Sequence, residues 1–326
     1  MHNITIKDIA KSLGVSTSTV SRALRDSHEI STKTKEKILA YANEVNFIPN
    51  PMAMSLRGKI NKSIAVIVPS LHNSFFSEVI EGIDSVAHQR GYQITIFQTH
   101  ESYEREIEEI NHALSRRVDG IALSITITTK DYLHIKELVD TNFPMVFFDR
   151  VPNIPNTPKI TIDNFKIAYQ ATQKIIDKGA KIFAYITIPL ILTNIQERYE
   201  GFLQCLKDNN LTFDDRFLKV CTFDPREAEA AAKEILLNHT IDAIFTISDR
   251  LTVEICRTIK KINNTNLRPV LHFGFTNLAT ADLLYPPVIS ISQPAFQLGV
   301  KTAENLLYNI ESKSLISRKN DHIIIE

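Results

Sequence analysis

Residues 4–24 read ITIKDIAKSLGVSTSTVSRAL, and the interpretation of the whole chain starts from this stretch. A first helix is predicted by apolar residues at positions i, i+3, i+4 and i+7, namely Ile6, Ile9, Ala10 and Leu13. Thr5 lies three residues before Asp8, which indicates a capping box with Asp in the place usually held by Glu. Gly14 follows the last apolar position, where a helix often ends in a left-handed conformation. The stretch therefore opens with one short amphipathic helix.

Two more short helices follow the first. Ser16 is a suitable N-cap for the second helix, and Ser31 for the third. Their apolar faces are formed by Val20, Ala23 and Leu24 and by Ile38, Tyr41, Ala42 and Val45. Three short helices, the first two joined by a glycine turn, are typical of a helix-turn-helix domain.

The polar face of the second helix favours DNA binding. It carries Thr17, Ser18, Ser21 and Arg22, close to the helix N-terminus. Arginine binds guanine with two hydrogen bonds in the major groove, while serine and threonine adapt to several base edges. Residues 1–60 hold nine basic and five acidic side chains, a net charge of +4, although the whole chain is neutral. A small solvated three-helix bundle is the alternative that spacing alone leaves open.

A short helix is also predicted in the linker at 48–60. Asn50 is a possible N-cap, and Pro51 fits the first helical position. Two turns of helix are unstable alone in water, so this segment needs a partner surface. Ala53 and Leu56 share one side, and Arg57 follows, a pattern that suits insertion into a minor groove. The alternative is an ordinary linker with incidental apolar residues.

From residue 63 onward, strand and helix patterns alternate. Short apolar runs such as Ile64–Val68 and Met145–Phe148 alternate with amphipathic segments such as Phe75–Gln89. The alternation predicts an α/β fold with parallel sheets flanked by helices, and its restart near Lys159 indicates two lobes. With 44% hydrophobic and 23% charged residues, the composition excludes a mainly disordered or fibrous chain.

Polar and aromatic residues gather where the predicted strands end. Because ligands bind beyond the carboxyl ends of such strands, these residues predict a cleft that suits a polyhydroxylated ligand. The candidates are Ser70, Asn73, Phe75, Phe76, Asp149, Arg150, Asp163, Arg198, Phe223, Ser248, Asp249, Thr276 and Gln293. For each of them the alternative is a structural role. Asp249 is equally suited to capping a helix, and Arg150 to an ion pair between the lobes.

Other classes of function find no support in the sequence. No apolar signal core and no apolar run of about 20 residues is present, so we expect a cytoplasmic protein without a membrane segment. The cysteines Cys205, Cys221 and Cys256 are widely spaced, which favours reduced core thiols over disulfides or a metal site. The chain lacks GxGxxG, GxxxxGK[ST], HExxH and GxSxG motifs, so we expect no enzyme, no cofactor and no metal.

The first sixty residues resemble the DNA-binding head of the LacI/GalR transcriptional regulators. The stretches that carry the resemblance are Thr5-Ile6-Lys7-Asp8-Ile9-Ala10, Gly14-Val15-Ser16, Thr19-Val20-Ser21-Arg22-Ala23-Leu24, Ser31, Thr34-Lys35, Pro49-Asn50, Ala53, Leu56 and Gly58. The resemblance implies that Thr17, Ser18 and Arg22 contact bases and that Leu56 opens a minor-groove step. The full set expected at the DNA is Thr5, Ser16, Thr17, Ser18, Thr19, Ser21, Arg22, Ser31, Thr34, Asn50, Ala53, Leu56 and Arg57.

The remainder resembles the periplasmic-binding-protein-like core of the same regulators. The matching points are Asn73-x-Phe75-Phe76, Asp149-Arg150, Asp163-Asn164, Arg198-x-x-Gly201-Phe202, Ser248-Asp249 and Gln293-Pro294. The resemblance implies effector contacts from Asp149, Arg198 and Gln293, with Phe75 and Phe223 as stacking rings. Two departures alter the pocket: Gly274-Phe275-Thr276 replaces a Gly-x-Asp turn, and Ile188-Pro189 replaces a Gly-Pro.

The expected organisation is a helix-turn-helix domain at 1–47, a hinge at 48–60 and two lobes. We assign 61–161 plus 292–320 to the N-terminal lobe, and 162–291 plus 321–326 to the C-terminal lobe. The resemblance implies a homodimer on double-stranded operator DNA, most simply a repressor, controlled by a small sugar-like effector. It leaves open whether the effector releases or promotes DNA binding. The alternatives are a solute-binding protein without a regulatory role, and a regulator that responds to a nucleobase or a sugar phosphate.

Overall fold

The computed structural model describes residues 4–24, 27, 29–45, 47, 61–262, 269–312 and 322–325. The chain divides into two compact units, Met1–Asn61 and Lys62–Glu326. The predicted hinge lies at the end of the first unit. Its candidate DNA contacts fall outside the described residues: Asn50, Ala53, Leu56 and Arg57.

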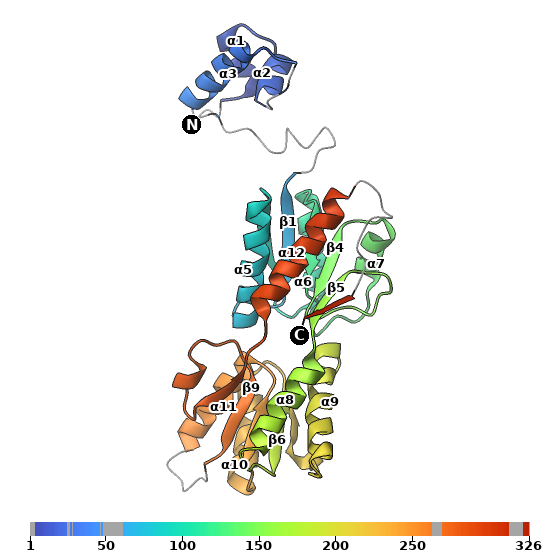
Figure 1. Ribbon diagram of the computed structural model, residues 1–326, viewed down its shortest axis with the longest axis vertical. Coiled ribbons are helices and arrows are strands. Elements are labelled where there is room, and N and C mark those ends of the chain that lie inside the picture. Colours follow the sequence, from blue (N-terminus) through green and yellow to red (C-terminus); the bar gives the residue numbers. More distant parts are fainter. Residues whose placement is uncertain are drawn as a thin grey trace. The chain divides into compact units, whose positions relative to one another are not determined.

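The first unit contains the three predicted helices (Figure 1): α1 (Ile6–Leu13), α2 (Thr17–Ala23) and α3 (Thr32–Glu44). Thr5 and Asp8 form the predicted capping box, and Gly14 ends α1 with φ 66°, a conformation that costs glycine little. The apolar faces meet in a small core made of Ile9, Ala10, Val20, Ala23, Ile38 and Ala42. The helix-turn-helix prediction is confirmed.

The second unit is built on two parallel sheets, which confirms the predicted α/β class. The first sheet has the order β11-β5-β4-β3-β1-β2, and the second has the order β10-β9-β8-β6-β7. The first contains β1 (Ser63–Val68), β2 (Gln93–Gln98), β3 (Gly120–Leu123), β4 (Met145–Phe148), β5 (Lys159–Ile162) and β11 (His322–Ile325). The second contains β6 (Phe183–Thr187), β7 (Leu218–Val220), β8 (Ala243–Thr246), β9 (Leu271–Phe275) and β10 (Val288–Ile291).

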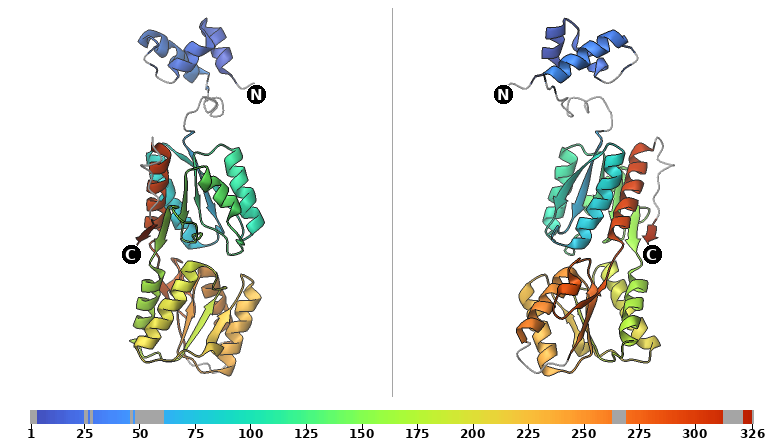
Figure 2. Two further views of the ribbon diagram at one scale, coloured as in Figure 1. Left: turned by 90° about the vertical axis from the view of Figure 1, so that its right-hand side faces the viewer. Right: turned by 60° about the vertical axis from the view of Figure 1, so that its left-hand side comes forward.

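Helices cover both faces of the first sheet (Figure 2). They are α5 (Ser74–Gln89), α6 (Tyr103–Ser115), α7 (Leu133–Asp140) and α12 (Ala295–Glu311). α5 and α12 lie side by side (Figures 1 and 2). Gly82 and Gly299 allow the two backbones to approach closely because neither residue has a Cβ. A Cβ on Gly82 would overlap Phe296 O, and one on Gly299 would overlap Val79 O. This pair joins residues that are more than two hundred positions apart in the sequence.

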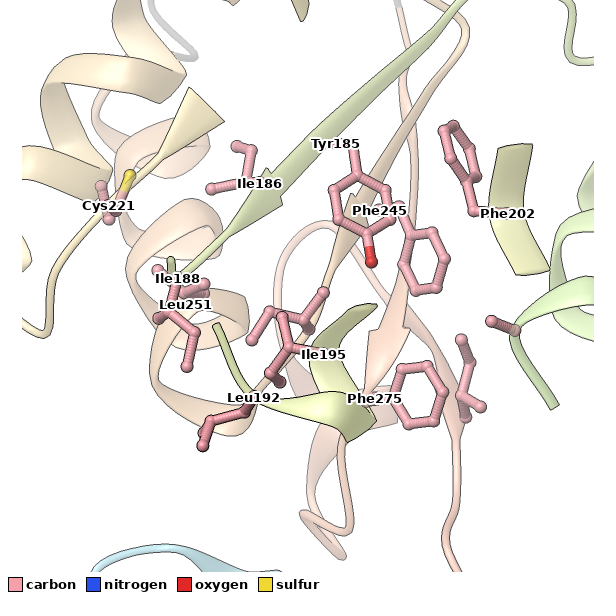
Figure 3. Packing of buried hydrophobic residues seen from close by; sticks show 14 of the residues in the cluster. Tyr185, Ile186, Ile188, Leu192, Ile195, Phe202, Cys221, Phe245, Leu251 and Phe275 are labelled. Carbon is pink, nitrogen blue, oxygen red and sulfur yellow. The ribbon is translucent and has the colours of Figure 1, made fainter. Parts of the chain in front are cut away.

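The second sheet is flanked in the same way by α8 (Asn164–Ile176), α9 (Thr193–Asp208), α10 (Pro225–Asn238) and α11 (Asp249–Ile262). Two short 3-10 helices, η1 (Asp215–Phe217) and η2 (Ala281–Leu283), lie in its loops. Aromatic rings fill this lobe, and Figure 3 shows Tyr185, Phe202 and Phe245 in one cluster with Phe275 beside it. The Tyr185 ring lies 4.9 Å from both the Phe202 and Phe245 rings, which leaves a rigid wall behind the site described below.

The chain passes from the first sheet to the second after β5 and returns after β10, close to the predicted boundaries. The predicted assignment of 321–326 to the C-terminal lobe is wrong for the described part of this segment, His322–Ile325. Strand β11 pairs in parallel with β5 of the first sheet, with Ile323 opposite Ile160. The apolar run His322–Ile325 gives no information on which sheet edge it joins, so only the pairing decides.

Candidate functional site

The α2 helix of the first unit presents one buried and one exposed face. Val20 and Ala23 are buried, while Thr17, Ser18 and Arg22 are exposed. The Ser16 Oγ accepts a hydrogen bond from the Thr19 backbone N–H at 3.0 Å and so caps the helix. The exposed face of α2 therefore carries polar residues that the sequence predicts at the DNA, and their contact with DNA stays a prediction.

Several other predicted DNA contacts hold each other in place. The Ser16 hydroxyl lies 2.7 Å from Ser18 Oγ and 2.8 Å from Thr19 Oγ1, and Ser31 Oγ lies 2.9 Å from Thr34 Oγ1. Thr5 Oγ1 donates to Asp8 Oδ2 at 2.6 Å. Thr19, Ser21 and Thr34 are half-buried. Thr5, Ser16 and Ser31 therefore cap helices, and the contact of all these residues with DNA stays a prediction.

A cavity lies between the two lobes of the second unit, at the carboxyl ends of the strands. Its volume is about 50 Å³. The predicted residues that line it are Ser70, Asn73, Phe75, Phe76, Asp149, Arg150, Arg198, Phe223, Ser248, Asp249 and Gln293. Their convergence supports the rule that parallel strands deliver their following loops to one edge.

Two predicted effector residues do not line this cavity. Asp163 caps α8, because its Oδ1 accepts a hydrogen bond from the Lys166 N–H at 2.9 Å. Thr276 is buried behind the cavity wall, where its Oγ1 accepts a hydrogen bond from the Leu278 N–H at 3.1 Å. Both side chains thus have a structural role, and their contact with an effector stays a prediction.

The structure also adds lining residues that sequence reasoning missed: Glu101, Ile188, Asn194, Ile195, Ile247, Arg250 and Phe275. Two of them lie at the departures from the family pattern. Ile188 places an apolar side chain at the cavity, and Phe275 places a ring there. Asn194 and Ile195 lie in the first turn of α9, where the sequence gives no strand-end signal.

Arg198 is the central cation of the cavity, and only 5% of its surface is exposed. Its Nε donates to Asn164 Oδ1 and its Nη1 to the Ile247 carbonyl, both at 2.9 Å. The guanidinium carbon lies 3.9 Å from the Phe275 ring centroid, a cation–π contact. Burial lowers the pKa of Arg198, while the negative charge of Asp149 raises it. Arginine stays charged in proteins, so this is a fixed positive group.

Asp149 faces Arg198 in the buried interior. Burial raises the pKa of its carboxyl group, against the opposing effect of the Arg198 and Arg150 charges and of the hydrogen bond from Asn194. Its backbone has φ 56°, which is unusual for a residue with a side chain and occurs often at ligand sites. The carboxylate Oδ1 accepts from Asn194 Nδ2 at 3.1 Å, across the two lobes.

Arg150 forms its ion pair within the first lobe rather than between lobes. Its Nη1 lies 2.8 and 2.9 Å from the two carboxylate oxygens of Glu101. Glu101 Oε2 also accepts from the Ile127 N–H at 3.0 Å, which fixes the carboxylate. A neutral, well-ordered pair thus forms one wall of the cavity.

Three residues that line the cavity each carry a buried polar atom without a hydrogen-bond partner among the described residues: Asn194 Oδ1, Ser248 Oγ and Gln293 Nε2. A buried polar group that lacks a partner costs about 1–3 kcal/mol. Most buried polar atoms in proteins have a partner, and a polar ligand bound between the lobes is one way to supply it.

Hydrogen bonds join the lobes around the cavity. Asp249 Oδ2 accepts from the Ser74 N–H at 3.0 Å, at the N-terminus of α5. Asn277 Nδ2 donates to Glu78 Oε2 at 2.8 Å. Asp249 is the first residue of α11 in its own lobe, and its side chain caps helix α5 of the opposite lobe. These contacts describe a closed arrangement of the two lobes.

Among the described residues, no helix is both long and apolar enough to span a bilayer. The same residues contain no cluster of three or more His, Cys, Asp or Glu side chains suited to a metal ion.

The fold and the cavity define a two-lobed binding core of the periplasmic-binding-protein type, preceded by a helix-turn-helix head. Residues 61–324 match the family described as periplasmic binding proteins and sugar binding domain of LacI family. Residues 5–50 match the family of bacterial regulatory proteins, lacI family. The chain therefore belongs to the LacI family: it is a DNA-binding transcriptional regulator with a small-molecule effector.

Individual proteins agree with this membership. The ribose operon repressor of Halalkalibacterium halodurans is 30% identical over 95% of this chain and 92% of its own length. A lac repressor dimer bound to operator and the anti-inducer ONPF has a TM-score of 0.81 and 22% identity, covering 96% of this chain and 94% of that one. A LacI family regulator from Enterococcus faecium with bound ribose has a TM-score of 0.70 and 22% identity, covering 81% and 94%.

Proposed function

We propose that this regulator binds a neutral, polyhydroxylated molecule of the size of a simple sugar between its lobes, and that binding changes its affinity for operator DNA. The three unpartnered buried atoms Asn194 Oδ1, Ser248 Oγ and Gln293 Nε2 carry this proposal. They comprise an acceptor, a hydroxyl and a donor, which are the partners that the hydroxyl groups of a ligand need. The Phe75 and Phe223 side chains line the same space and suit the C–H faces of a sugar ring.

The charges of the cavity favour a neutral ligand over a sugar phosphate. The ionisable lining residues are three carboxylates, Glu101, Asp149 and Asp249, and three guanidinium groups, Arg150, Arg198 and Arg250, so their formal charges cancel. A phosphate buried here would add negative charge that no further lining cation compensates, and burying an uncompensated charge is costly.

The size of the cavity indicates that the lobes open to admit the ligand. A volume of about 50 Å³ is a third of the roughly 150 Å³ that accommodates benzene in a protein interior. Opening would separate Asp249 from Ser74 and Asn277 from Glu78, and the ligand would favour the more open form because only that form has room for it.

In the helix-turn-helix head, Thr17, Ser18 and Arg22 would read bases in the major groove, as their exposure on α2 permits. Two heads of a homodimer would bind a two-fold symmetric operator in the cytoplasm. Coupling between the two sites is reciprocal and typically about 1–3 kcal/mol. The protein works by binding and catalyses no reaction.

Ligand-induced stabilisation tests the proposal. We expect saturating ribose, or another pentose or hexose in a panel, to raise the melting temperature by about 5 °C, as about 100-fold excess over Kd implies. Asn194→Ala should abolish the shift, because it removes an unpartnered acceptor and the bond to Asp149. Asn238→Ala changes an exposed asparagine at the end of α10 and should leave the shift intact.

A nucleobase or a sugar phosphate is the informative competitor in the same panel. A shift with one of these and none with any sugar would reject the proposed ligand class. Fluorescence anisotropy with a duplex selected by the protein then measures whether the active compound lowers or raises DNA affinity.

A further inference from the structure

The exposed face of α2 carries an ion pair that base reading by itself does not require. Nε of Arg22 lies 3.0 Å from Oε2 of Glu29, and the two side chains are 50% and 53% exposed. The loop after α2 brings Glu29 back toward the helix. The Ser27 N–H donates to the Arg22 carbonyl at 3.1 Å, and the Glu29 N–H donates to Ser27 Oγ at 3.3 Å. The backbone itself therefore places the carboxylate beside the guanidinium group.

Stability does not explain this acidic residue. An exposed ion pair contributes little to folding, because water and salt screen it and two flexible side chains must be ordered. A carboxylate beside a DNA-reading surface also repels phosphates and weakens general DNA binding. Glu29 thus has a cost at this position, and its benefit must lie in what it does to Arg22.

The geometry of the contact suggests that benefit. Arginine has five N–H groups in one rigid plane, and Nε carries one of them. A carboxylate on Nε fixes the plane of the guanidinium group. The terminal amino groups carry the other four N–H groups, and they are the groups that reach guanine O6 and N7 in an end-on bidentate contact. Arg22 would then meet the base already oriented, and less side-chain freedom would be lost on binding.

We infer that Glu29 is a positioning residue, which holds Arg22 for a guanine in the operator and thereby raises sequence discrimination at the expense of general DNA affinity. The inference rests on the proposed reading of a base by Arg22. It adds a second residue to the recognition of that base pair, from outside the recognition helix.

Full-length protein and duplexes that it selects from a randomised library test this role. The Arg22→Ala variant first identifies the base pair that Arg22 reads. At that position, the variant should bind a duplex with guanine and a duplex with adenine equally well. The quantity to compare is the ratio of affinities for the guanine duplex and the adenine duplex. We expect Glu29→Ala to lower this ratio about two- to five-fold, the range of an exposed ion pair. Affinity for random competitor DNA should stay equal or rise.

Two variants separate positioning from charge. Glu29→Gln keeps an oxygen that accepts from Arg22 Nε, so it should retain part of the discrimination. Glu44→Gln removes the same charge from the exposed end of α3 and should leave the ratio unchanged. A ratio that is unchanged or higher in Glu29→Ala overturns the inference alone, as does an equal loss in Glu44→Gln. If the selected duplexes contain no guanine whose recognition depends on Arg22, the proposed base reading is overturned as well.

Discussion

The two candidate sites of this regulator are built in opposite ways. The DNA-reading face consists of exposed side chains of one short helix, and its hydroxyls are held by neighbours two or three residues away. The effector cavity consists of buried groups from both lobes, and one of its lobe-to-lobe bonds joins residues 175 positions apart. A local, exposed site can lose a side chain without harm to the fold. A composite, buried site cannot, because its binding groups also hold the lobes together.

The sharpest test of this difference is to remove one arginine from each site. Arg198→Ala leaves Asn164 Oδ1 and the Ile247 carbonyl without their donor and Asp149 without its main compensating charge. We expect a loss of about 3 kcal/mol in the free energy of unfolding, because two buried acceptors lose their donor. Arg22→Ala should change stability by less than about 0.5 kcal/mol, because its side chain is at the surface. Urea unfolding followed by circular dichroism measures both.

Arg198→Lys serves as the control for charge. It keeps the cation but not the planar group that lies on Phe275 and donates in two directions, so we expect an intermediate loss. Equal losses in Arg198→Ala and Arg22→Ala would show that the cavity is as tolerant as the head, and the contrast between them would be lost.

The same contrast explains how far the sequence predicts each site. Thr5, Gly14 and Ser16 shape the head through contacts within a few residues, so periodicity and capping rules place them correctly. In the core, the strand-end rule finds Ser248 and Gln293, which leave strands at one sheet edge. It misses Asn194, which reaches Asp149 only when the lobes close, and Glu101, which is held in a left-handed turn at φ 61°. Contacts between lobes have no periodic signal in the chain.

A second prediction concerns His272, a buried titratable residue in strand β9 of the second sheet. Burial lowers the pKa of His272 from 6.5 to about 3, and its ring lies between Thr246 Oγ1 at 3.1 Å and Cys256 Sγ at 3.4 Å. Below the unfolded pKa, the unfolded chain binds a proton that the folded core excludes. Stability is therefore fully present above about pH 6.5 and falls as the pH drops toward 3. The loss at pH 5 is about 2 kcal/mol.

Urea titrations of the wild type and of His272→Gln at pH 7.5 and pH 5 measure this contribution. The variant should lose about 2 kcal/mol less on acidification than the wild type, since glutamine does not titrate. His88→Gln replaces an exposed histidine on α5 and should behave like the wild type. An identical pH dependence in His272→Gln and wild type would mean that the core admits the proton, contrary to the burial of the ring.

The smallest expected effect concerns the hydrogen bonds between the lobes. These bonds link effector binding in the cavity to DNA binding by the head. Glu78→Ala removes the acceptor for Asn277 Nδ2 without touching the cavity lining. We expect about five-fold tighter effector affinity, or about 1 kcal/mol, because this hydrogen bond stabilises only the closed form, which has no room for the effector. Glu81→Ala, an exposed neighbour on α5, is the matched control. Since coupling is reciprocal, Glu78→Ala should also increase the response of DNA binding to subsaturating effector, while the guanine preference set by the head stays unchanged. A variant that binds effector normally would show that this bond does not distinguish the closed form from the open one.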